Sequence, residues 1–368
     1  MRARCPTRLE RLPAQYFAGL LARVAAAARA EGEPVIDLGR GNPETGPPPH
    51  VVDALQRAAA RDDVHGYAPF RGLPELKEAI AARYRDVYRV EVDAASEVAV
   101  LPGAKTGLME FALCTAERGE TILLPDPGYP DYFSAVALAA AHVRPFAGEL
   151  DGDAAALYLN YPSNPTGAAV PDGLFERAVA WARRSDAWVL HDFAYGDLVF
   201  DGREPQSFLA APGAKDVGAE LFSMSKSYGM AGWRVGFLVG NAELVARVEL
   251  LQDHVFAGVF RPVQEAAIAA LTGPQDSVEA RRATYERRRN LALDALAGTD
   301  ARSEGTFFVW FRLPDGVDAE TLLARHRLAV APGEGFGVQG AGWARLSLAV
   351  SDDTLERGLT RLRAALAK

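Results

Sequence analysis

A chain of 368 residues, 49% of them hydrophobic, can bury a large core and predicts two domains or one domain with a satellite. Its formal net charge of -8 leaves no basic stripe for a nucleic-acid backbone, so we expect small-molecule partners and no nucleic acid. Two cysteines are too few for a disulfide framework or a sulfur-ligated metal site and indicate a reducing compartment, the cytoplasm. We expect no membrane span, because every apolar stretch is far shorter than about 20 residues.

The first 31 residues have a helical pattern, and the Gly- and Pro-rich stretch 35–49 predicts an extended linker. Apolar, strand-like runs then alternate with helix-like segments, which is typical of an α/β protein with a mainly parallel sheet. The predicted strands lie in 97–103, 121–130, 155–167, 187–195, 220–226 and 234–240. A helix should begin near Asn241. Ligands of such sheets bind at the carboxyl ends of the strands, so we expect the chemistry there.

The C-terminal part predicts a smaller α+β domain. Arginine-rich helices over about 277–298 precede strands in 306–313 and 344–350, and a closing helix covers about 352–366. We therefore divide the chain into 1–45, an N-terminal helix and linker belonging to the small domain, 46–275, a large three-layer α/β/α domain, and 276–368, the C-terminal small domain.

Lys226 is the candidate catalytic residue, and it is one of only five lysines in an arginine-rich chain. Ser223 and Ser225 alternate at the end of a predicted strand, so both hydroxyls can face one side, and Arg234 follows. A desolvated lysine can form a Schiff base with an aldehyde, while hydroxyls and a guanidinium suit a phosphate. An aldehyde and a phosphate on one small molecule describe pyridoxal phosphate.

This cofactor needs a carboxylate to keep its pyridine nitrogen protonated. Asp192 ends an apolar strand and is the candidate. Tyr195 and Asn164 could bind the ring oxygen, and Tyr129 could stack on the ring face. Gly103, Ala104 and Lys105 lie where a strand turns into a helix, so their backbone N–H groups form an anion site.

Each of these residues also has a simpler explanation. Ser- and Gly-rich turns usually just end strands, an Asp after a strand is often a helix cap, and Tyr129 is equally at home in a core. The joint order favours function, because the phosphate turn, the stacking aromatic, the amide, the carboxylate with its Tyr, and then the lysine and the arginine each lie at a separate strand end.

The stretch "SMSKSYGMAGWRVGF" resembles the lysine signature of the class I/II aminotransferases of fold type I, and "YPSNPTG" and "HDFAYGDLVF" resemble two other hallmarks of that family. The resemblance extends from "VIDLGRGNPETGPPPHVVDAL" to "APGEGFGVQGAGWARLSLAV". It implies a homodimeric pyridoxal-phosphate enzyme that transfers an amino group between an L-amino acid and a 2-oxo acid, with no metal ion.

The resemblance also implies roles for individual residues. Lys226 carries the cofactor and shuttles the proton, Asn164 contacts both cofactor and substrate, and Arg345 binds the α-carboxylate of the substrate, the alternative being an exposed strand-edge arginine. Tyr67 reaches the phosphate of the neighbouring subunit. Gly41 lies in a linker that folds over the substrate, although a simple turn glycine is nearly as good an explanation.

Within the family, the sequence most resembles the branch of alanine (glutamate–pyruvate) and LL-diaminopimelate aminotransferases. Residues 256–262 lack polar groups that several relatives carry, so a secondary-metabolic role on an unusual amino acid stays open. Arg40 is a candidate ligand for a distal carboxylate, but a solvated loop arginine is the favoured explanation. A carbon–sulfur β-lyase and a non-catalytic regulatory protein are the competing hypotheses.

Overall fold

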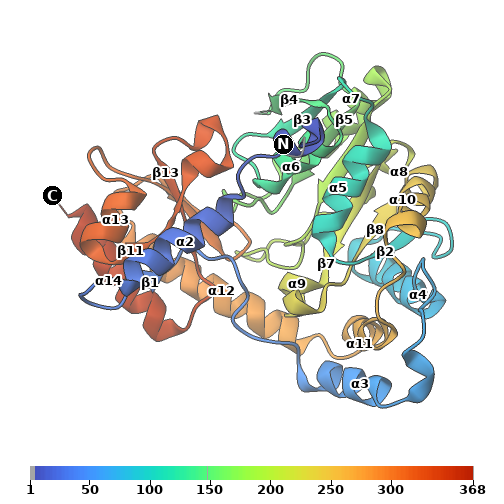
Figure 1. The fold of residues 1–368 in the computed structure, drawn as a ribbon, viewed down its shortest axis with the longest axis horizontal. Helices are drawn as coiled ribbons and strands as arrows, with labels where there is room; N and C mark the ends of the chain where they lie inside the picture. Colours follow the sequence, from blue (N-terminus) through green and yellow to red (C-terminus); the bar gives the residue numbers. More distant parts are fainter. Residues whose placement is uncertain (1–4, 147, 368) are drawn as a thin grey trace.

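The computed structural model describes residues 5–146 and 148–367, and a seven-stranded sheet forms the centre of the larger of its two bodies (Figure 1). All six predicted strands are present, and the structure adds β4 at one edge. In spatial order the strands are β2 Val98–Leu101, β8 Gly236–Gly240, β7 Gly218–Ser223, β6 Trp188–Asp192, β5 Ala156–Asn160, β3 Thr121–Pro125 and β4 His142–Phe146.

The sheet is mainly parallel, as predicted, with one reversed strand. The neighbours from β7 through β6, β5 and β3 to β4 all pair in parallel. β8 is antiparallel to both β7 and β2. It is reversed because residues 224–235 hold only short helical turns and bring the chain back along β7, as antiparallel neighbours allow.

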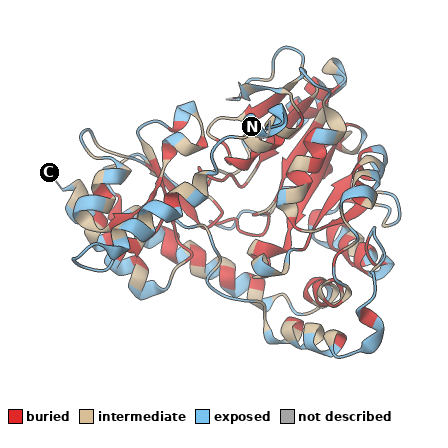
Figure 2. Ribbon diagram, in the orientation of Figure 1, coloured by how far each residue is buried: buried red, intermediate tan, exposed pale blue. Residues whose placement is uncertain are grey.

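Helices cover both faces of this sheet, which gives the predicted three-layer architecture. Successive strand residues alternate between two cores: Leu124 and Leu221 face one side, while Leu123 and Phe222 face the other. The first core is closed by α5 Ala104–Thr115, α6 Asp131–Leu138 and α10 Ala242–Val255, and the second by α3 Pro49–Ala59, α4 Pro74–Arg83, α7 Leu174–Ser185, α8 Ala214–Val217 and α11 Arg261–Thr272. Figure 2 shows that the strands between these layers are mostly buried, and the edge strand β4 is the exception, with only Phe146 buried.

The two ends of the chain meet in a second body. Its antiparallel sheet has the order β12 Ala331–Pro332, β13 Trp343–Ser347, β10 Phe308–Arg312 and β9 Ala301–Arg302. The N-terminal strand β1 Ile36–Asp37 pairs in parallel with β11 Leu328–Ala329. The surrounding helices are α2 Tyr16–Arg29, α12 Asp276–Ala295, α13 Ala319–His326 and α14 Asp352–Leu366. The arginine-rich stretch forms the single helix α12 rather than several helices.

Within the described residues, no helix combines the length and apolarity needed to cross a membrane.

A buried ion pair fixes α4 against the sheet. The Arg83 guanidinium, 7% exposed, pairs with the carboxylate of Asp197, which follows β6 and is also 7% exposed. The same guanidinium donates to the hydroxyls of Tyr228, at 2.8 Å, and Tyr88, at 3.2 Å. A buried charge of this kind is tolerated only because its partner and hydrogen bonds replace the lost water.

We expect Arg83→Met to lower the free energy of unfolding by about 3–5 kcal/mol, because Asp197 would be left buried without a cation. Urea unfolding followed by fluorescence would measure this. Arg85→Met is the matched control: Arg85 forms an exposed pair with Asp86, so it should cost less than about 1 kcal/mol. Adding Asp197→Leu to Arg83→Met should recover much of the loss, and equal effects of the two single variants would contradict the assignment.

Candidate active site

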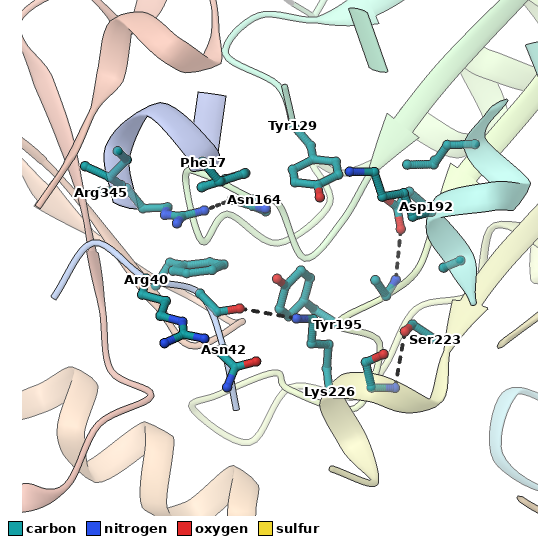
Figure 3. A pocket seen from close by; sticks show the side chains of 18 of the residues that line it. Phe17, Arg40, Asn42, Tyr129, Asn164, Asp192, Tyr195, Ser223, Lys226 and Arg345 are labelled. Atoms are coloured by element: carbon teal, nitrogen blue, oxygen red, sulfur yellow. Dashed lines mark hydrogen bonds between the residues drawn. The ribbon is translucent and has the colours of Figure 1, made fainter. Parts of the chain in front are cut away.

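A cavity of about 350 Å³ lies at the carboxyl edge of the large sheet, beside the second body (Figure 3). Most of the predicted site residues meet there. The lining includes Gly41, Ala104, Lys105, Tyr129, Asn164, Asp192, Tyr195, Ser223, Ser225, Lys226, Arg234 and Arg345. Gly103 is not part of the lining, but it directly precedes the lining residue Ala104. Tyr67 is 88% exposed and does not line the cavity within this chain.

Neighbouring parallel strands bring three of these residues together. Asp192 is the last residue of β6, Ser223 is the last residue of β7, and Asn164 follows β5. Asn160, at the end of β5, accepts a hydrogen bond from the Asn164 backbone N–H at 2.7 Å and donates to the Asp192 carbonyl at 2.8 Å. The sequence reasoning missed Asn160, although its position at the end of the predicted strand, shortly before the NPTG motif, was a usable signal.

Lys226 sits in the single helical turn α9 Met224–Ser227 and projects into the cavity. Its Nζ lies 5.3 Å from the ring centroid of Phe307 and 5.8 Å from that of Tyr195. Burial, reinforced by the positive charges of Arg345 and Arg234, lowers the pKa of Lys226 to about 8. Near neutral pH about a tenth of this amine is therefore neutral and nucleophilic, far more than of a free lysine, whose pKa is about 10.4.

The predicted alternation of Ser223 and Ser225 along a strand is wrong. The strand ends at Ser223, and Ser225 lies in the helical turn that follows. The Ser225 backbone N–H donates to the Ser223 Oγ at 3.2 Å, so Ser223 caps this turn. Both residues still line the cavity.

The turn before α5 has the backbone geometry expected of the predicted anion site. Gly103 caps the helix with φ 93°, a conformation that favours glycine, and a Cβ there would collide with the Arg234 guanidinium. The Lys105 Nζ lies 2.9 Å from Asp131 Oδ2, so this residue offers its backbone N–H rather than its side chain. The helix N-terminus and Arg234 thus converge on one point, as a phosphate requires.

Asp192 is buried, and burial raises its pKa, while hydrogen bonds oppose that rise. The Tyr132 hydroxyl donates to Oδ2 at 2.7 Å, and the Ala194 backbone N–H donates to Oδ1 at 3.2 Å. Sequence reasoning missed Tyr132, which lies in the first turn of α6, shortly after Tyr129; its closeness to Tyr129 was the available signal. The hydroxyl of Tyr195 makes no hydrogen bond to a residue that the structure describes, and burial raises its pKa well above its usual value.

Arg345 lies on β13, between β12 and β10, and is 1% exposed, so the alternative of an exposed strand-edge arginine is wrong. Its Nη1 donates to Asn164 Oδ1 at 2.8 Å, and its Nη2 donates to the Gly39 carbonyl at 3.0 Å. The guanidinium also lies 3.8 Å from the ring centroid of Phe308. Burial lowers its pKa to about 10, so it stays charged at neutral pH and can bind a carboxylate.

Helix α2 adds an apolar wall that the sequence did not reveal. Phe17, Leu20 and Leu21 line the cavity, and the Phe17 ring centroid lies 5.2 Å from Arg345 Cζ and 6.1 Å from that of Tyr129. These contacts join segments more than 100 residues apart, which local sequence patterns cannot show.

Comparison with known proteins gives one consistent result. The family model described as aminotransferase class I and II matches residues 33–362. The L-glutamine–4-(methylsulfanyl)-2-oxobutanoate aminotransferase of Bacillus subtilis (strain 168) is 44% identical and covers 96% of this chain and 94% of its own length. The glutamate-pyruvate aminotransferase AlaC of Escherichia coli (strain K12) is 38% identical, with 97% and 93% covered. The substrate-bound structure of BacF from Bacillus subtilis superposes with a TM-score of 0.91, at 36% identity and 98% coverage of both chains.

The pKa of Lys226 predicts how covalent attachment of added pyridoxal phosphate depends on pH. In cofactor-free protein, the attachment rate should rise with pH and level off above about 8, because only the neutral amine attacks an aldehyde. The rate is measured by rapid reduction with borohydride and mass spectrometry of the labelled peptide. A free lysine derivative is the control and should continue to gain reactivity up to about pH 10.4; the same profile at Lys226 would contradict the depressed pKa.

Tyr132→Phe removes the hydroxyl that donates to Asp192 and leaves the ring. The pKa of Asp192 should rise further, so the carboxyl competes for the proton that the pyridine nitrogen needs. We expect turnover to fall about 10-fold, the effect of one hydrogen bond to a charged group. Tyr158→Phe is the matched control, since this buried hydroxyl donates to the Leu108 carbonyl at 2.7 Å and not to Asp192. Equal losses in both variants would show that the effect is only structural.

Proposed function

The chain belongs to the class I and II aminotransferases and is a pyridoxal-phosphate-dependent transaminase. From that premise we propose that Lys226 carries the cofactor and moves the proton of the reaction. One observation carries the proposal: Lys226, with a pKa of about 8, lies between the buried carboxylate of Asp192 and the buried guanidinium of Arg345 (Figure 3). The amine thus has a carboxylate on the cofactor side and a guanidinium on the substrate side.

The free polar groups of the cavity fit this cofactor. When bound, pyridoxal phosphate supplies an electron sink for the α-carbon of the substrate. Asp192 would hold the proton on the pyridine nitrogen, and the free hydroxyl of Tyr195 and the Asn164 amide would donate to the ring oxygen. Tyr129 would pack against the ring face. The phosphate would bind to the backbone of the turn 103–105, to Arg234 and to the hydroxyls of Ser223 and Ser225.

The substrate would bind on the other side of Lys226. Arg345 would hold the α-carboxylate with both arms of its guanidinium, which fixes the direction of the Cα–H bond relative to the amine. Gly41 would give this carboxylate room, because a Cβ there would lie 2.8 Å from Phe308 Cζ and 3.5 Å from Arg345 Nη2. The neutral Lys226 amine would take the α-proton of the substrate and, as the protonated amine, would give that proton back when the amino group is transferred.

The substrates we propose are an L-amino acid and a 2-oxo acid, of which at least one has an uncharged side chain. The apolar wall of Phe17, Leu20 and Leu21 favours such a side chain, and the thioether oxo acid and the pyruvate in the names of two relatives agree with it. The competing carbon–sulfur β-lyase activity is not favoured, because the relatives named above are aminotransferases.

We also propose a cytoplasmic homodimer. Large apolar side chains are exposed near Tyr67: Phe70, 42% exposed, has its ring centroid 6.3 Å from that of Tyr67, and Phe260, 47% exposed, has its ring centroid 6.1 Å from that of His65. An exposed patch of this kind is typical of an interface, from which Tyr67 would reach the phosphate site of the partner. A solution mass equal to one 39.5 kDa chain would contradict the dimer.

The proposed cytoplasmic location rests on the two cysteines, which are both free thiols, as in a reducing compartment. Cell fractionation would test this location.

Adding single amino acids to the cofactor-loaded protein tests the proposed activity. Glutamine, methionine, alanine, glutamate, aspartate and LL-diaminopimelate are the first donors. A donor should bleach the visible band of the bound cofactor, and a 2-oxo acid should restore it, because the amino group returns to the acceptor. Lys226→Ala should abolish the response at every donor. Release of ammonia and an oxo acid without an acceptor would favour the lyase instead.

A further inference from the structure

Five cationic side chains line the cavity, and four of them already have a partner in the protein. Lys105 pairs with a carboxylate, and Lys226, Arg234 and Arg345 each donate to a carbonyl or amide oxygen. Arg40 is the exception: within the described parts of the chain, its side chain makes no hydrogen bond and no ion pair. An unpaired guanidinium on the wall of a binding cavity is available to an anionic ligand.

The backbone around Arg40 is fixed although its side chain is free. The preceding carbonyl, of Gly39, accepts a hydrogen bond from Arg345 Nη2 at 3.0 Å, and the following carbonyl, of Gly41, accepts one from Lys226 Nζ at 3.4 Å. Further along, Arg281 Nη1 donates to the Thr45 carbonyl at 3.1 Å. Arg40 is therefore held between the two groups that bind the substrate carboxylate and move the proton.

No acidic residue on this segment is left to neutralise Arg40. Asp37 Oδ1 accepts a hydrogen bond from the Gly39 N–H at 2.9 Å. Glu44 Oε1 lies 2.7 Å from Arg288 Nη1, an ion pair with α12. The carboxylates nearest in the sequence are thus occupied elsewhere, and the charge of Arg40 faces the cavity and the solvent.

We propose that Arg40 binds the side-chain carboxylate of a dicarboxylic amino acid or 2-oxo acid, an inference that rests on the proposed transaminase site. In Figure 3, Arg40 and Arg345 lie on the same side of Lys226, away from Asp192 and Ser223. Because Arg345 binds the α-carboxylate, the second carboxylate of such a substrate meets Arg40. This makes Arg40 a specificity-determining residue, not the solvated loop arginine that the sequence favoured.

The same cavity must accept two different substrates in turn, and its wall suits both. Phe17, Leu20 and Leu21 offer an apolar surface to an uncharged side chain. Arg40 is exposed and long, so its guanidinium can stay in water while an apolar substrate is bound and turn inward for a dicarboxylate. One site thus serves both half-reactions, and no carboxylate of the protein has to leave Arg40 before a dicarboxylic substrate can bind it.

Binding of two unreactive five-carbon acids tests this without turnover. The cofactor-loaded wild type should bind glutarate, a dicarboxylate, more tightly than pentanoate, a monocarboxylate. Arg40→Gln should reduce the ratio of the two affinities about 10-fold, the order expected for a charge-assisted hydrogen bond on an exposed side chain. Arg40→Lys should retain part of the preference, and added salt should weaken it. Arg312→Gln, which removes an exposed charge outside the cavity, should leave the ratio unchanged.

The half-reaction rates provide the second readout. Arg40→Gln should lower kcat/KM for glutamate and 2-oxoglutarate about 10-fold relative to methionine and its oxo acid. An unchanged ratio, or an equal loss for both classes, would overturn the proposal. Dissociation of the assembly in Arg40→Gln would also overturn it, since Arg40 would then be a partner contact. If wild-type protein transaminates nothing, the proposed function fails, while the comparison of glutarate with pentanoate still decides the role of Arg40.

Discussion

The structure depends on one constraint: a lysine amine must be buried deeply enough for its pKa to fall and still be open to a ligand. Lys226 meets this constraint because two aromatic rings replace its water and two guanidinium groups disfavour its positive charge. The nearby carboxylate of Asp192 opposes the shift, but more weakly. The resulting pKa of about 8 is therefore a property of the assembled cavity and not of the local sequence.

Two separately packed bodies supply the groups that make this cavity. The large sheet contributes the cofactor side, because parallel strands end at a common edge and place Asp192 and Ser223 next to each other. The second body contributes Arg345 from the middle of an antiparallel sheet. The segment at Gly39 and Gly41 joins the two, since one carbonyl binds Arg345 and the other binds Lys226. Any displacement of this segment would change the substrate side and the lysine together.

Local sequence patterns predicted the elements well and the contacts between them poorly. The closing helix was predicted at its observed bounds, and the strand carrying Asp192 was found, because apolar runs and turn residues mark such elements directly. β4 was missed, since residues 142–146 are mostly exposed or partly exposed and lack an apolar run. Tyr132 and Phe17 were missed for a different reason: each acts through a residue that is distant in the sequence. The position of Ser225 was misjudged because a strand and a single helical turn place alternate residues differently.

The proposed role of Arg40 would let one cavity discriminate between substrates without a rigid polar pocket. A buried, fixed cation for a distal carboxylate would be left unpaired whenever an apolar substrate was bound, at a cost of several kcal/mol. An exposed arginine avoids this cost, because water replaces the carboxylate when the substrate has none. The buried Arg345 has no such freedom, and its proposed ligand is the α-carboxylate, which every amino acid and 2-oxo acid shares. In this proposal the buried arginine binds the carboxylate that all substrates share, and the exposed arginine binds the second carboxylate that only some substrates have.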